Sequence, residues 1–211
     1  MPGLIHGLER DVIRDNLARV RERAGPEVEI LAATKYVPVE EMGALLDAGV
    51  TLVGENRLQD IEAKQERWGE GFTWDFIGNL QSRKVKALVP RVRLIHSLAS
   101  DSALEQLGRH APPDTEVLVE VNVAGEDSKG GIQPAALGDF ISRSPARVVG
   151  LMAMPPFTQN PEDSRPHFAK VAELAAEHGL SGLSMGTSQD WEVALEEGAT
   201  IIRLGTTLYA R

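Results

Sequence analysis

The sequence has no cysteine among its 211 residues, and it has no excess of positive charge. The absence of cysteine excludes disulfides, thiolate zinc sites and cysteine nucleophiles. Lysine and arginine number 22 against 31 aspartates and glutamates, which gives a formal net charge of −9. This balance disfavours a general binder of nucleic acid or of anionic membranes, because both need positive charge. One small anion held in a dedicated pocket remains compatible with it.

Long apolar runs are also missing. The N-terminal stretch MPGLIHGLERDVIRDN turns charged early and lacks the apolar core of a signal peptide. No stretch approaches the roughly 18 apolar residues that a membrane-spanning helix needs. We therefore expect a cytoplasmic protein with neither membrane nor nucleic-acid partners, present as a monomer or weak dimer. The five histidines (6, 96, 110, 167 and 178) show no metal-ligand spacing, so we expect no metal.

Short apolar runs alternate with segments of helical periodicity along the chain. Strands are expected at 29–34, 51–54, 73–77, 93–96, 116–121, 148–152, 182–184 and 200–204. Helical segments are expected near 5–24, 38–48, 56–68, 81–88, 101–110, 134–143, 161–178 and 188–197. Regular alternation of this kind predicts a parallel sheet with helical crossovers. Eight repeats favour a closed (β/α)8 TIM barrel, formed as a single domain over residues 1–211, rather than an open doubly wound sheet.

The two ends of the sequence complete this interpretation. The segment 5–24 ends at Gly25-Pro26, as helices often do, and the last strand is followed only by a short tail. The N-terminal helix would then take the place of the final outer helix of the barrel.

Functional residues of such a barrel gather at the C-terminal ends of the strands. Lys35 directly follows the first strand, where a partly dry mouth would lower the pKa of its amine and allow a Schiff base to form. The alternative is a solvated lysine at a strand exit. His96 ends the fourth strand, where it either lines the pocket or is simply a packed or solvated histidine.

The loops after the last two strands, SMGTS (184–188) and RLGT (203–206), contain small and hydroxylated residues. Such loops bring backbone N–H groups close to an anion, and barrels often bind phosphate at this position. Each motif alone is also compatible with a plain turn and helix cap. Arg203 lies within the last strand, where it needs a partner. That partner is either a barrel carboxylate or a bound ligand.

A Schiff-base lysine, a phosphate site and an arginine for a ring nitrogen together describe a site for pyridoxal 5′-phosphate. The sequence also resembles the pyridoxal-phosphate homeostasis proteins (the YggS/PROSC group), whose barrel is similar to the N-terminal domain of alanine racemase. The matching stretches span the chain in order: AATKYVP (32–38), GENRLQD (54–60), WDFIGNLQSRK (74–84), IHS (95–97), EVNVAGEDSKGGI (120–132), GLMAMPP (150–156), LSMGTSQDWEVALEEGAT (183–200) and IRLGTTLYA (202–210).

The resemblance implies that Lys35 holds pyridoxal phosphate through a Schiff base, with Asn56 beside the ring and Arg203 against the pyridine nitrogen. It implies a phosphate site formed by Met185, Gly186, Thr187, Ser188, Gly205 and Thr206. Thr187 stands where the family more often has methionine, and DSKGG (127–131) stands where it commonly reads SKSG or SKHG.

The implied function is buffering or delivery of pyridoxal phosphate to apo-enzymes, without strong catalysis. An arginine only donates hydrogen bonds, so Arg203 would leave the ring nitrogen unprotonated and the ring a weak electron sink. We find no obvious opposing base and no second domain in the sequence, as a racemase would need. Lys129 in GEDSKGG offers a second, mobile amine, or else it is a solvated charge. The alternatives are a racemase-like enzyme and a cofactor-free Schiff-base aldolase or phosphosugar enzyme.

Overall fold

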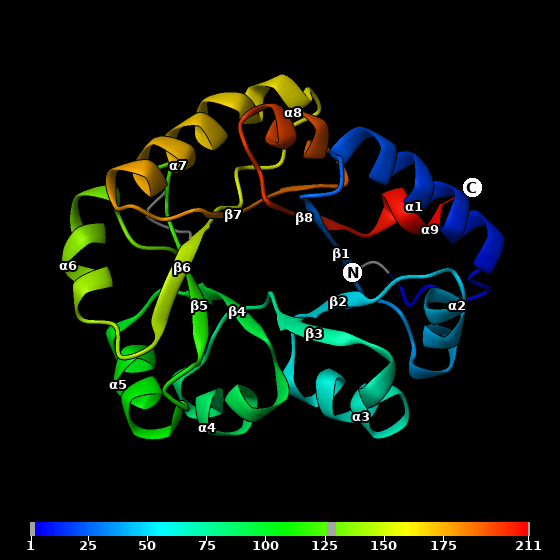
Figure 1. Cartoon of the computed structure of the whole chain (residues 1–211), viewed down its shortest axis with the longest axis horizontal. Coiled ribbons are helices and arrows are strands. Elements are labelled where there is room, and N and C mark those ends of the chain that lie inside the picture. Colours follow the sequence, from blue (N-terminus) through cyan, green and yellow to red (C-terminus); the bar gives the residue numbers. More distant parts are fainter. Residues whose placement is uncertain (1–2, 126–129, 211) are drawn as a thin grey trace.

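The computed structural model describes residues 3–125 and 130–210, and within them the strands form a closed parallel barrel in the order β1 to β8 (Figure 1). The barrel confirms the (β/α)8 expectation. Each strand lies within a few residues of its expected position. The strands are β1 (Glu29–Ala33), β2 (Leu52–Glu55), β3 (Thr73–Phe76), β4 (Leu94–Leu98), β5 (Glu116–Glu120), β6 (Arg147–Met152), β7 (Gly182–Thr187) and β8 (Ile201–Leu204).

Helices surround the strands on the outside (Figure 1). They are α1 (Arg10–Ala24), α2 (Met42–Asp47), α3 (Leu58–Trp68), α4 (Val85–Leu88), α5 (Asp101–His110), α6 (Leu137–Ser142), α7 (Arg165–Glu177), α8 (Trp191–Glu196) and α9 (Thr206–Tyr209). The expected helix at 81–88 is reduced to α4 between two 3-10 turns, and the second turn contains Pro90, which has no N–H to donate. None of the helices in the described part is both long and apolar enough to cross a membrane.

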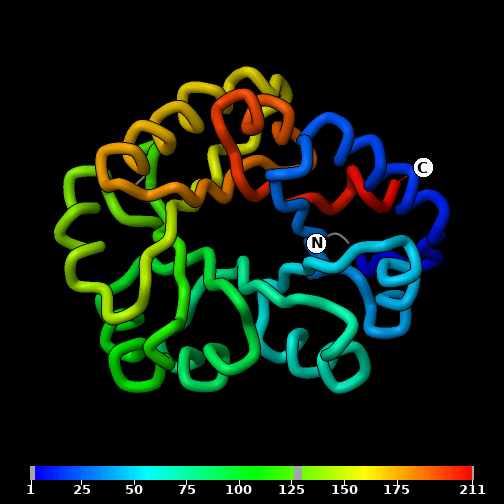
Figure 2. Tube along the Cα trace, in the orientation of Figure 1, coloured from blue at the N-terminus to red at the C-terminus, as the bar shows by residue number. Residues whose placement is uncertain are grey.

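The tail after the last strand differs from the sequence-based expectation, because it forms the short helix α9. The amides of Leu208 and Tyr209 both donate to the carbonyl of Gly205 and so turn the chain back on itself. Helix α1 lies beside α9 in the outer ring, where the blue and red segments of Figure 2 meet. The Asn16 side-chain amide donates to the carbonyls of Leu208 (3.0 Å) and Ala210 (2.9 Å). The N-terminal helix therefore fills the last place in the ring, as expected.

Two apolar layers hold the barrel together. The larger one fills the space between strands and helices, and it includes Ile13 of α1 and Phe168 of α7, both fully buried. The smaller one fills the barrel interior with Leu31, Leu52, Leu94, Leu118, Met152 and Ile201. Alternate strand residues face these two layers, because the side-chain period of a strand is two.

Polar side chains replace the apolar filling elsewhere inside the barrel. Asp75, His96 and Ser184 have no exposed surface, and Arg203 is 6% exposed. His96 is therefore a packed interior residue, which decides between the two interpretations of it. A barrel interior with buried charge is costly unless each group has a partner, so these residues mark a functional region.

Candidate cofactor site

Lys35 lies two residues beyond the end of β1, in the turn that leaves the barrel. Its side chain is exposed, and Nζ lies 5.1 Å from the centre of the half-buried Tyr36 ring. The expected burial of this amine in a dry mouth is therefore not found. The reason is that β1 ends at Ala33, one residue earlier than expected, so Lys35 lies two residues beyond the strand instead of directly after it. The amine is open to an incoming aldehyde.

The backbone before Lys35 is held by buried polar groups. The Tyr209 hydroxyl donates to the Ala33 carbonyl at 3.1 Å, and the Lys64 ammonium donates to the Thr34 carbonyl at 2.7 Å. Lys64 also pairs with Glu55, a carboxylate with no exposed surface. Burial, and then the nearby Glu55 charge, raise the pKa of Tyr209, so its hydroxyl remains a hydrogen-bond donor.

Glu55 joins this arrangement to the end of β2. Its Oε1 accepts the Thr34 hydroxyl at 2.7 Å, and its Oε2 accepts the backbone N–H of Asn56 at 3.3 Å. One carboxylate therefore fixes the chain next to Lys35 and the chain at Asn56 together. We call Thr34, Glu55 and Lys64 the anchor cluster.

Asn56 carries an unsatisfied group. Among the described residues, its Oδ1 is buried and has no hydrogen-bond partner. Buried polar atoms are rarely left unpaired, since an unmade hydrogen bond costs about 1–3 kcal/mol. Gly78, which follows β3, packs closely against the Asn56 backbone. A Cβ at position 78 would lie 2.1 Å from the Asn56 carbonyl oxygen, so only glycine fits there. The Asn56 Oδ1 can therefore accept a hydrogen bond from a bound ligand.

Ser188 joins the loops after β7 and β8. Its Oγ accepts the backbone N–H of Gly205 (3.1 Å) and of Thr207 (3.2 Å). Two amides thus converge on one oxygen, the arrangement in which backbone donors hold an anion. Thr206 is exposed beside them. Of the expected phosphate residues, the structure brings Ser188, Gly205 and Thr206 together.

The remaining residues of the SMGTS loop serve mainly to shape it. The Met185 side chain is fully buried in the layer between strands and helices, which leaves its backbone for a ligand. Gly186 has a φ of 88°, and a Cβ there would lie 2.6 Å from that of Ala194. The Thr187 amide and hydroxyl donate to Asp190 at 2.7 and 3.1 Å.

Arg203 is held at the barrel centre by uncharged groups. Its Nη1 donates to the carbonyl (2.6 Å) and hydroxyl (2.5 Å) of Ser184, and its Nη2 donates to the Ala153 carbonyl (2.9 Å). Within residues 3–125 and 130–210, no carboxylate forms an ion pair with Arg203, so the carboxylate alternative for its partner is not found there. Burial lowers the pKa of Arg203 to about 10, so the guanidinium stays charged at neutral pH.

Two cavities open among the strand ends, of about 380 and 290 Å³, and Glu120, Gly130 and Met154 line both. Gly186 and Thr187 line the larger cavity, and Asn56 lines the smaller. Burial raises the pKa of Glu120, an effect that the nearby Arg203 charge opposes. Lys35 lies outside both linings, on the β1 side, and Lys129 lies outside the described residues.

Sequence reasoning missed the anchor cluster, Asp190 and Glu120. A signal existed for Lys64, because it follows Leu58 and Ile61 at a spacing of three on the buried face of α3. A charge on such a face requires a partner. A signal also existed for Asp190, which directly precedes α8. For Glu120 the signal was its position at the end of the apolar strand β5, where barrels place functional residues.

The residues present fit a phosphorylated pyridine aldehyde. The site offers an open amine at Lys35, two converging amides at Ser188, and an unpaired acceptor at Asn56. Arg203 adds a charged donor at the barrel centre.

The sequence is similar to a known domain family and to named proteins. The model of the family described as "Alanine racemase, N-terminal domain" matches residues 8–211. The chain is 40% identical to the pyridoxal phosphate homeostasis protein of Aquifex aeolicus, with 93% of this chain and 94% of that protein covered. It is 35% identical to the protein of the same name from Pseudomonas aeruginosa, over 93% of this chain and 94% of that one.

Solved structures agree with the sequence comparison. PipY of Synechococcus elongatus, described as having PLP bound, superposes with a TM-score of 0.82 at 31% identity and covers 94% of this chain and all (100%) of its own. Alanine racemase from Corynebacterium glutamicum shares the fold, with a TM-score of 0.76 at 14% identity, over 97% of this chain and 61% of the racemase. The chain belongs to the family of pyridoxal phosphate homeostasis proteins, within the alanine racemase N-terminal domain fold.

Proposed function

We propose that this protein binds pyridoxal 5′-phosphate covalently at Lys35 and serves to buffer or deliver it. The observation that carries the proposal is the adjacency of β7, β8 and β1 in the barrel. These three strands bring the Ser188 loop, Arg203 and Lys35 to neighbouring positions at one end of the barrel. The 31% identical PipY, described with PLP bound, supports the same ligand. We also propose a cytoplasmic location, since a cysteine-free chain needs no oxidising compartment.

The cofactor would supply an aldehyde, a group that condenses with an amine and releases water, and Lys35 would hold it through its amine. The residues of the protein position the amine and bind the rest of the cofactor. The anchor cluster and Tyr209 hold the turn that presents the amine. The amides of Gly205 and Thr207 fix the Ser188 Oγ, whose hydroxyl hydrogen could donate to a phosphate, and Asn56 would offer an acceptor to the cofactor.

Borohydride reduction tests the covalent site. After incubation with pyridoxal phosphate, reduction and peptide mapping should place a phosphopyridoxyl group on Lys35. The variant Lys35→Ala should lose the visible absorption band, whereas Lys170→Ala, which removes an exposed lysine of α7, should keep it. Labelling spread over surface lysines with Lys35 unmodified would contradict the proposal.

We propose further that the protein has no strong catalytic activity. Arg203 is a donor that stays charged, so it leaves the pyridine nitrogen unprotonated and weakens the ring as an electron sink. The Tyr209 hydroxyl donates to the Ala33 carbonyl, and its raised pKa keeps it protonated at neutral pH, so it cannot serve as the base. Exchange of the α-proton of alanine in deuterated water should therefore stay near the rate with free cofactor. Turnover of about 1 per second or more would establish the racemase alternative instead.

A further inference from the structure

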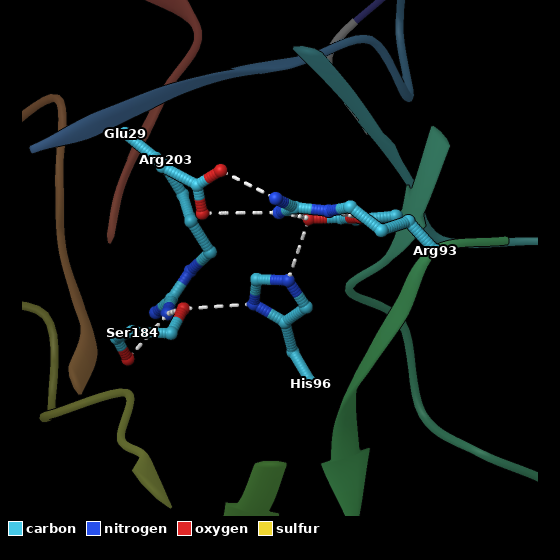
Figure 3. A network of polar contacts seen from close by, with 6 residues as sticks. Glu29, Arg93, His96, Ser184 and Arg203 are labelled. Atoms are coloured by element: carbon cyan, nitrogen blue, oxygen red, sulfur yellow. Dashed lines mark hydrogen bonds and ion pairs between the residues drawn. The ribbon is translucent and has the colours of Figure 1, made fainter. Parts of the chain in front are cut away.

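A line of polar side chains runs through the barrel interior (Figure 3). It begins at Glu29, continues through Arg93, Asp75 and His96, and ends at Ser184 and Arg203. Glu29 and Arg93 lie at the N-terminal end of the barrel, where they are partly exposed. The other members are buried. We call this set the inner polar chain.

The donor and acceptor at each link follow from the charges. Burial alone would raise the pKa of Asp75, but hydrogen bonds from His96 and Arg93 bring it below its ordinary value, so Asp75 is a carboxylate and only accepts. Arg93 donates to it from Nε (3.0 Å) and Nη2 (2.7 Å). His96 Nε2 lies 3.1 Å from Asp75 Oδ2, so this nitrogen carries the hydrogen.

The other ring nitrogen of His96 must then be an acceptor. Burial lowers the pKa of His96 despite the opposing effect of Asp75, so the imidazole is neutral and Nδ1 carries no hydrogen. Nδ1 lies 2.8 Å from the Ser184 Oγ, which leaves the hydroxyl hydrogen pointing at His96. The lone pairs of the Ser184 Oγ are thereby free to accept Arg203 Nη1 at 2.5 Å. The three links between Arg203 and Asp75 therefore all donate toward Asp75, and Arg93 donates to the same carboxylate from the other side.

We propose that Ser184 and His96 are positioning residues that hold the Arg203 guanidinium for the pyridine nitrogen of the cofactor. The inference rests on the proposed function. Arg203 has five N–H groups, and three hydrogen bonds to Ser184 and Ala153 hold one side of it. The remaining donors are those available to a ligand. Because His96 cannot rotate without losing Asp75, the serine hydroxyl cannot turn its hydrogen toward Arg203.

The first measurement needs no cofactor. Nitrogen-15 NMR of histidine-labelled protein should show His96 neutral at pH 7, with hydrogen on Nε2 and none on Nδ1. A ring protonated on Nδ1 would reverse the link to Ser184 and overturn the inference.

The second measurement follows the bound cofactor. Ser184→Ala should weaken retention of pyridoxal phosphate about tenfold, because only the backbone carbonyls of residues 153 and 184 then hold the guanidinium that is placed for the ring nitrogen. It should also shift the nitrogen-15 resonance of the labelled pyridine ring, and Ser184→Thr, which keeps the hydroxyl, should restore both. The matched control is Thr200→Val, which removes a hydroxyl that bonds to the Leu183 backbone between the same two strands and does not contact Arg203.

The outcomes separate the two proposals. If the wild-type protein binds pyridoxal phosphate but Ser184→Ala behaves like Thr200→Val, the positioning role is wrong and the proposed function stands. If the wild-type protein does not bind it, the proposed function fails and the role of Ser184 and His96 fails with it.

Discussion

Replacing Lys64 by methionine tests the anchor cluster most directly. Methionine keeps the length and much of the volume of the side chain, so the change removes mainly the ammonium group. Glu55 then remains as a carboxylate with no exposed surface and no cation beside it, and the Thr34 carbonyl loses its donor. Both losses fall on the backbone that precedes Lys35.

The size of the effect follows from burial. Glu55 is 0% exposed and Lys64 is 4% exposed. Breaking a buried ion pair by removing one partner costs about 3–5 kcal/mol. In a chain of this size 1 kcal/mol shifts Tm by about 2–4 °C, so Lys64→Met should lower Tm by roughly 6–20 °C.

Urea unfolding followed by circular dichroism gives the free energy of unfolding, and borohydride trapping gives the occupancy of Lys35. The double variant Lys64→Met with Glu55→Gln should regain much of the lost stability, because no buried charge remains. Lys170→Met is the matched control, since its pair with Glu173 is exposed and worth less than about 1 kcal/mol. A loss below about 1 kcal/mol in Lys64→Met would refute the reasoning.

Three further predictions concern the strand ends and the interior. Ser188→Ala should weaken retention of pyridoxal phosphate about tenfold or more but change that of unphosphorylated pyridoxal little, since hydrogen bonds to a charged group are worth about 1.5–3 kcal/mol; equal losses by equilibrium dialysis would contradict the phosphate assignment. Gly78→Ala should destabilise the fold by about 1–3 kcal/mol, because the added methyl group would clash with the Asn56 carbonyl. Gly69→Ala is the control, since the nearest atom to its added methyl group is 3.8 Å away. Equal urea midpoints for the two variants would contradict this prediction. Because the pKa of His96 is lowered in the fold, the unfolded chain takes up a proton at higher pH than the folded one. The free energy of unfolding should therefore fall as pH drops below 6.5, by up to about 1.4 kcal/mol per pH unit. A wild-type stability that does not change with pH, or the same pH dependence in His96→Gln, would contradict this prediction.

The barrel was predictable because each repeat carries its own signal. An apolar run of four to six residues followed by a helical segment recurs from 29 to 204, and the closed order of strands confirms the inference. The short helix α9 was not predictable, because four residues are too few to show a periodicity. Its formation depends on packing against α1, a contact between distant parts of the sequence.

The candidate site was predictable where a residue's chemistry depends on its position along a strand. Lys35, Ser188 and Arg203 follow or end strands, so the fold class alone places them at one end of the barrel. The anchor cluster and the inner polar chain depend on which side chains meet across strands. Register and shear decide such contacts, and Ser184, for example, is 88 residues from His96 in sequence. No local pattern carries that information.

The meeting of α1 with α9 has a consequence for synthesis of the protein. Asn16 bonds to carbonyls 192 and 194 residues later, and β8 pairs with both β1 and β7. A nascent chain that has emerged only as far as β7 therefore holds two open sheet edges, at β1 and β7, with no strand between them. Contacts between residues so far apart in sequence form late, so α1 has no α9 to pack against until the C-terminal residues have been synthesised. The stage most exposed to aggregation is consequently the interval before β8 emerges, when a chaperone that shields strand edges would have the greatest effect.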